Sequence, residues 1–164
     1  MKSFKIELRW GILFSLALMI WGFIEKNIGW HDKYIDSQLG NHFLVLIVFY
    51  AVIYYFGIRE KRKSYYHGIM NWKEAFISGA MISVIIAILS PLTQFFIYHY
   101  ISPDYFQQMI AYQVHKTVMP MSENSAVLFF SMKGYIIQAI FTSLSLGLIM
   151  AALMALVLKR KSKE

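Results

Sequence analysis

The chain has 164 residues, of which 58% are hydrophobic and 15% are charged. Soluble domains are about 45–50% apolar and about 25% charged, so this composition excludes an ordinary soluble domain and favours one domain, residues 1–164, within a lipid bilayer. The chain has no cysteine, which excludes a disulfide framework, a thiol nucleophile and a thiolate metal site.

Four long uncharged runs predict an all-α bundle of four transmembrane helices, since a span needs roughly 20 apolar residues. The first run, residues 10–24, is short, but the flanking Arg9, Glu25 and Lys26 can extend it by reaching towards the interfaces. No small-residue cleavage site follows it, so a signal peptide is rejected. The predicted helices cover about 8–28, 39–58, 73–100 and 124–158.

The basic residues predict the orientation of these helices. Three lie before the first helix, five between the second and third, and four after the last, whereas the two opposite loops and their borders hold four. By the positive-inside rule both termini are cytoplasmic. The formal net charge of +7 is then explained by orientation and by contacts to anionic lipid, and nucleic acid is not an expected partner. Aromatic anchors are expected at the inner interface (Trp10, Trp72) and the outer one (Trp30, Tyr98, Tyr100, Tyr135).

Small residues recur every fourth position in the third and fourth predicted helices. Residues four apart share one helix face, and small side chains let two backbones approach closely in lipid. Since the two helices are antiparallel, Gly79 is expected opposite Ala151 and Ser83 opposite Gly147. A row that faces another copy of the protein is the alternative. The rows are Ala75, Gly79, Ser83 and Ala87, and Ala139, Ser143, Gly147, Ala151 and Ala155.

Pro91 near the outer end of the third helix predicts a kink, because proline cannot donate to the carbonyl of Ala87. Gln94, and Gln138 on the fourth helix, are expected at similar depths in the outer half of the bundle. They are either polar contacts between helices or part of a polar cavity open to the outside.

The outer segment between the third and fourth helices begins with Ser102-Pro103-Asp104, which resembles a helix start. Apolar side chains then recur on one face. A short amphipathic helix is predicted at about 104–117, lying on the membrane or over the mouth of the bundle.

Most residues with chemical potential lie in the predicted outer loops. Their histidines and carboxylates could in principle bind zinc, but no two histidines have the spacing of a helical metal site, so no metal or cofactor is predicted. His31 is expected in a peripheral loop, where its replacement should leave folding largely intact. The outer-face polar candidates are Glu25, His31, Asp32, His99 and Asp104.

Five motifs give the sequence a family resemblance. They are residues 29–32 (Gly-Trp-His-Asp), 57–62 (Gly-Ile-Arg-Glu-Lys-Arg), 72–79 (Trp-Lys-Glu-Ala-Phe-Ile-Ser-Gly), 89–94 (Leu-Ser-Pro-Leu-Thr-Gln) and 101–106 (Ile-Ser-Pro-Asp-Tyr-Phe). From about Trp10 to the C-terminal lysines the chain resembles the small bacterial membrane proteins known as domain of unknown function 4199. Their first-loop motif usually reads Gly-Leu-His-Asp, and Trp30 replaces the leucine here. The resemblance implies a four-helix protein of the bacterial cytoplasmic (inner) membrane and implies no activity.

Three classes of function remain. The sequence favours a non-catalytic structural or interaction protein, whose partners are lipids, a second copy of itself or another membrane protein, because no charge lies deep within a helix. The first alternative is a small transporter or channel subunit with a polar path near Gln94 and Gln138. The second is a membrane enzyme with an outer-face site at His31, Asp32 and Asp104, which no catalytic motif supports.

Overall fold

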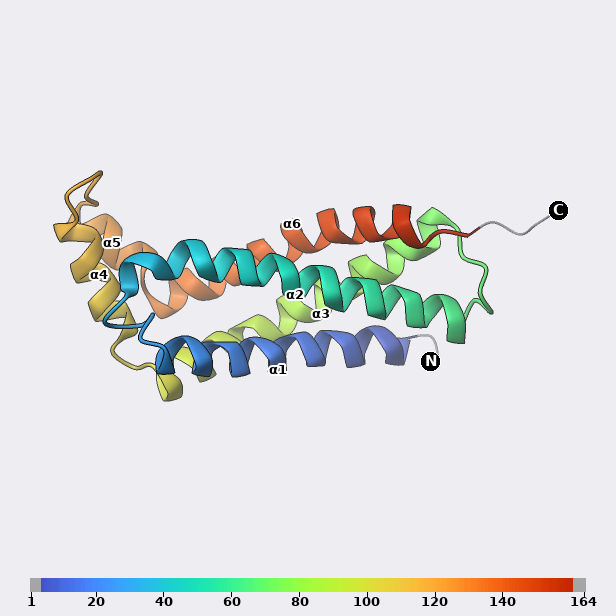
Figure 1. The fold of residues 1–164 in the computed structure, drawn as a ribbon, viewed down its shortest axis with the longest axis horizontal. Helices are drawn as coiled ribbons and strands as arrows, with labels where there is room; N and C mark the ends of the chain where they lie inside the picture. The colour runs from blue at the N-terminus through green and yellow to red at the C-terminus, as the bar shows by residue number, and fades with distance from the viewer. Residues whose placement is uncertain (1–3, 161–164) are drawn as a thin grey trace.

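The computed structural model describes residues 4–160, and within that range the chain forms helices around two apolar cores. Four helices are long and apolar enough to cross a membrane, which indicates a multi-pass membrane protein. The helices are α1 (Lys5–Asn27), α2 (Ile35–Ser64), α3 (Trp72–Phe95), the π-helix η2 (Phe96–Ile101), α4 (Tyr105–His115), α5 (Glu123–Phe129) and α6 (Met132–Leu158). Figure 1 shows the four long helices side by side, with α4 and α5 at one end, here called the loop end.

The first two helices are longer at their charged ends than the sequence suggested. α1 starts at Lys5 rather than near 8, and α2 covers Ile35–Ser64 rather than 39–58. The charged residues just outside the apolar runs pair with one another, and such pairing lets the helices continue. The Nζ atom of Lys61 lies 2.8 Å from Oε1 of Glu7, which also accepts from the Ser78 hydroxyl at 2.9 Å. These contacts join α1, α2 and α3 at the end opposite the loop end, here called the terminal end.

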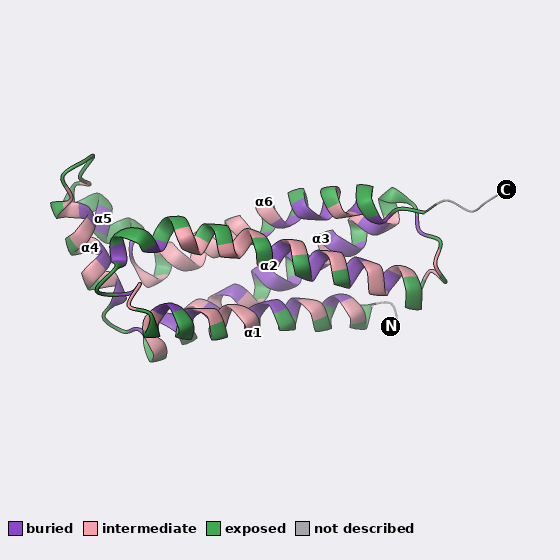
Figure 2. Cartoon of the chain, in the orientation of Figure 1, coloured by how far each residue is buried: buried purple, intermediate pink, exposed green. Residues whose placement is uncertain are grey.

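Helices α3 and α6 make the most extensive contact in the bundle. A Cβ added to Gly79 would lie 2.5 Å from Cβ of Ala151, and one added to Gly147 would lie 2.5 Å from Oγ of Ser83. These are the pairs expected from the two rows of small residues. Over this stretch the two rows therefore pack against each other within one chain. Along the bundle, buried residues face the interior and exposed apolar residues face outward (Figure 2).

Helix α3 continues through Pro91 and ends in the π-helix η2. The Ser90 hydroxyl donates to the carbonyl oxygen of Ala87 at 2.9 Å, and this bond replaces the one that Pro91 cannot make. The wider turn of η2 places Ile97 and Tyr98 in the second core. Tyr98 is therefore buried beneath α4 and is not the interfacial anchor that the sequence suggested.

A single helix over 124–158 was the wrong expectation, because the chain breaks at Phe130 and Ser131. Phe130 leaves helical geometry at φ −95° and ψ 61°, and Ser131 begins α6 as its N-cap by accepting from the Gly134 amide at 3.0 Å. The side-chain amide of Gln138 donates to the carbonyl of Phe129 at 3.0 Å, which satisfies a backbone group that the break leaves free. α4 forms within the stretch expected to be helical, 104–117.

Candidate ligand-binding cavity

A cavity of about 240 Å³ extends from the middle of the bundle to the loop end, and all four long helices line it. Its wall combines aromatic and aliphatic side chains with a few polar groups, which is the usual make-up of a small-molecule site. Both intramembrane glutamines, Gln94 and Gln138, lie in this wall, together with Glu25 and His42.

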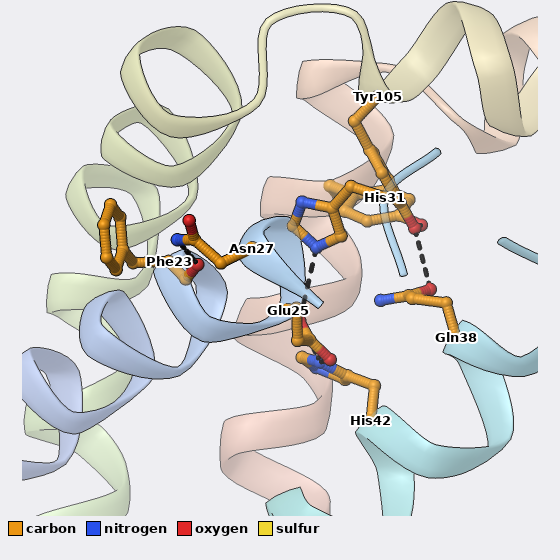
Figure 3. Close-up of polar contacts among 8 residues, drawn as sticks. Phe23, Glu25, Asn27, His31, Gln38, His42 and Tyr105 are labelled. Atoms are coloured by element: carbon orange, nitrogen blue, oxygen red, sulfur yellow. Dashed lines mark hydrogen bonds and ion pairs between the residues drawn. The ribbon is translucent and has the colours of Figure 1, made fainter. Parts of the chain in front are cut away.

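The carboxylate of Glu25 lies between two imidazoles. The two oxygen atoms of Glu25 lie 2.9 and 3.1 Å from Nδ1 of His42, and Oε2 lies 3.4 Å from Nε2 of His31. Figure 3 shows the two rings on opposite sides of the carboxylate. Glu25 is 1% exposed and the side chain of His42 is 32% exposed, so His42 is the part of this group that the cavity reaches most readily.

Local geometry brings these three residues together. α1 ends at Asn27, and Gly29 takes a positive φ of 85° that turns the chain back towards α2. The Tyr34 amide then donates to the carbonyl of Gly29 at 2.7 Å, which closes the turn. His31 lies within this connection, and His42 lies near the start of α2. Both imidazoles therefore lie against the C-terminal end of α1, which carries Glu25.

The hydrogen bonds assign protons within the group. An ionised carboxylate only accepts, so His42 donates through Nδ1 and His31 through Nε2. Nδ1 of His31 is buried and has no hydrogen-bond partner in the part of the chain described. A proton on that atom would be a buried donor without a partner, which is unfavourable. When the His42 ring is neutral and carries its proton on Nδ1, its Nε2 atom is free of a proton and can accept a hydrogen bond.

Tyrosine side chains close the cavity at the loop end. The hydroxyl of Tyr105 on α4 donates to Oε1 of Gln38 at 3.0 Å and lies 2.8 Å from the hydroxyl oxygen of Tyr135. Its ring packs against the tilted rings of Tyr98 and His31, with centroids 4.8 and 4.9 Å away. Burial raises the pKa of Tyr105 well above its usual value, so its hydroxyl stays protonated at neutral pH. α4 is thus fixed over the cavity by hydrogen bonds and ring contacts.

The two predicted glutamines line the same cavity but differ in their contacts. Gln138 uses its amide on the Phe129 carbonyl, whereas Oε1 of Gln94 is buried and has no partner within residues 4–160. A buried amide oxygen without a donor is unfavourable. The cavity wall therefore includes a residue with a buried acceptor that has no partner within residues 4–160.

The remaining outer-face candidates are not part of this cavity. Asp32 is exposed and pairs with Lys26 at 3.1 Å, and hydrogen bonds from the Lys33 amide and from Lys26 lower its pKa. Asp104 and His99 are exposed, and His99 stacks on Phe95. No group of three or more histidine, aspartate or glutamate side chains among the described residues is arranged so that it could hold a metal ion.

His31 is not peripheral, contrary to the expectation from its place in a loop, because the turn folds it beneath Tyr105 with no exposed surface. Sequence reasoning also missed His42 and Gln38 as partners of Glu25 and Tyr105. The available signal was the short connection between α1 and α2, which brings the end of one helix to the start of the next.

Comparison with known protein families assigns the chain. A model of the family described as "Protein of unknown function (DUF4199)" matches residues 9–160. The chain belongs to this family. No curated protein and no solved structure matches it. Family membership therefore confirms the resemblance seen in the sequence, and the function has to be argued from the cavity.

Proposed function

We propose that this member of the DUF4199 family binds a small molecule within the membrane, as a small transporter or a subunit of one. The observation that carries the proposal is the cavity of about 240 Å³ between all four long helices, with a buried carboxylate in its wall. Ionisable residues inside a membrane bundle are energetically costly and usually mark a substrate or ion path.

The enzyme alternative has weaker support. Its three residues contact other partners: His31 contacts Glu25, Asp32 pairs with Lys26, and Asp104 is exposed at the start of α4. One observation supports the interaction-protein alternative: the outer faces of the long helices are apolar and exposed. Lipid chains satisfy those faces, and a second copy or another membrane protein could cover part of them.

The proposed setting is the bacterial cytoplasmic membrane, with both termini in the cytoplasm. The bias of basic residues towards the terminal end supports it. The loop end, with α4 lying across it, then faces outward, and the cavity occupies the outer half of the bundle. A ligand would approach past α4 or between the long helices.

Filling the cavity tests the proposal. Ala139 lines the cavity, whereas Ile137 on the same helix is 56% exposed and does not. The purified protein in detergent is screened with small polar fragments by thermal shift. We expect fragments that stabilise the wild type and Ile137→Trp but not Ala139→Trp. If every stabilising fragment acts equally on Ala139→Trp, the cavity is not the binding site.

A further inference from the structure

A single carboxylate sets the charge of the cavity wall. Among the described side chains that line the cavity, Glu25 is the only acidic one, and no lysine or arginine is present. His42 is the lining side chain that can neutralise Glu25 by taking up a proton. The titratable groups around the pair are His31 from the turn, Tyr98 from η2, Tyr105 from α4 and Tyr135 from α6, and α3 contributes the non-ionising Thr93 and Gln94.

An ionised Glu25 can be balanced in two ways. Nδ1 of His31 is buried and has no partner within residues 4–160, so a proton there would be unfavourable, and the balancing charge comes either from a proton on His42 or from a cation in the cavity. An unbalanced charge of either sign is unfavourable in a low-dielectric interior. The His42 proton and a bound cation therefore exclude each other.

The remainder of the wall suits an organic cation rather than a bare metal ion. Five aromatic rings line the cavity, and ring faces attract ammonium groups. Two of them, Phe14 and Tyr50, are in contact, with centroids 4.6 Å apart and planes tilted by 57°. Gln94 in the same wall has a buried acceptor, Oε1, without a partner among the described residues. The aromatic residues are Phe14, Phe43, Tyr50, Tyr98 and Tyr135.

We propose that the cavity binds a small organic cation and that binding releases one proton from His42. This proposal rests on the cavity being the binding site argued above, and it specifies the ligand class and the coupling. In a transporter, such an exchange would let a proton and a cation use the same site alternately.

Two matched probes test the proposal on the wild-type protein. Choline carries a permanent positive charge, and 3,3-dimethyl-1-butanol has the same shape with a carbon in place of the nitrogen. Calorimetric titration in detergent is run in two buffers with different ionisation heats, which counts the protons released. We expect choline to bind at least about tenfold more tightly and to release about one proton. Its affinity should fall by up to about tenfold per unit of pH in the acidic range, because protons compete with it.

Two variants separate the parts of the proposal. His42→Gln keeps a donor for Glu25 and should bind choline without proton release and without the pH dependence. Glu25→Gln should bind choline no better than the neutral analogue. If Glu25→Gln does not fold, the comparison of the two probes on the wild type still tests whether the cavity prefers a cation.

Different failures have different meanings. Equal binding of both probes to the wild type would overturn the cation proposal and leave the cavity as a binding site. Choline binding without proton release would overturn the coupling. Binding of neither probe would overturn the cation proposal, and the proposed function would also fail if the Ala139→Trp screen showed no difference from the wild type.

Discussion

The Glu25 carboxylate is held by two imidazoles that come from different parts of the chain. Its contact with His31 depends on the turn at Gly29. His42 is 17 residues from Glu25, and no local pattern links the two. Such pairs come from tertiary geometry, which residue spacing alone does not specify.

Tyr105 provides a direct test of how α4 is held. Tyr105→Phe removes the hydroxyl that bonds Gln38 and Tyr135, and leaves the Gln38 oxygen without its donor. We expect a loss of about 1–2 kcal/mol in the free energy of unfolding in detergent. Tyr100→Phe, which alters an exposed tyrosine, is the control and should change the stability little. Equal stabilities of the two variants would contradict the role given to Tyr105.

The same variant has a distinct pH signature. Because burial raises the pKa of Tyr105, its contribution to stability is fully present below the unfolded-state value of about 10 and is lost as the pH rises above it. The difference in melting temperature between the wild type and Tyr105→Phe should therefore narrow above about pH 10. A constant difference across the alkaline range would show that Tyr105 is not buried in the protonated form.

The positive-inside rule treats Lys61 at the terminal end as an orientation signal only. In the structure Lys61 is 3% exposed and contacts Glu7, a residue to which the sequence drew no attention. Lys61→Ala strands the buried Glu7 carboxylate and should cost about 3–5 kcal/mol, as measured by unfolding in detergent. Lys63→Ala is the matched control. The double variant Glu7→Gln/Lys61→Met should be more stable than Lys61→Ala, and the opposite order would contradict a buried ion pair.

Helix pairing was predictable at the scale of elements. A four-residue repeat is a local property of the sequence, and antiparallel neighbours fix which small residues meet. The break between α5 and α6 was not predictable in this way, because residues 124–158 are mostly apolar with one charged residue, Lys133, and the break depends on Ser131 and Gln138 side-chain contacts.

Substitution of Gly79 tests the α3–α6 contact. Gly79→Leu forces a side chain into Ala151 and should destabilise the protein by at least about 1–3 kcal/mol. Gly40 lies in α2 with open space where its Cβ would be, so Gly40→Leu is the control. Thermal unfolding in detergent compares them. Wild-type stability of Gly79→Leu would show that α3 and α6 do not pack as described.

At the scale of the whole molecule, the four spans follow from composition and length, whereas the cavity depends on how the four long helices pack around its lining residues. The proposed orientation is easily measured because the chain has no cysteine. In intact cells, an impermeant thiol reagent should label Thr117→Cys near the loop end and not Lys63→Cys near the terminal end. Labelling of Lys63→Cys alone would reverse the proposed topology.

Accessibility of the cavity tests the central claim most directly. Thr142 lines the cavity, and Ile149 on the same helix is 57% exposed on the outer, lipid-facing surface. A small charged thiol reagent is applied to Thr142→Cys and Ile149→Cys in lipid vesicles, with and without choline. We expect Thr142→Cys to react, since thiols react as thiolates in contact with water, and choline to slow that reaction, while Ile149→Cys remains unreactive. Thr142→Cys as unreactive as Ile149→Cys would mean that no accessible binding cavity exists between these helices.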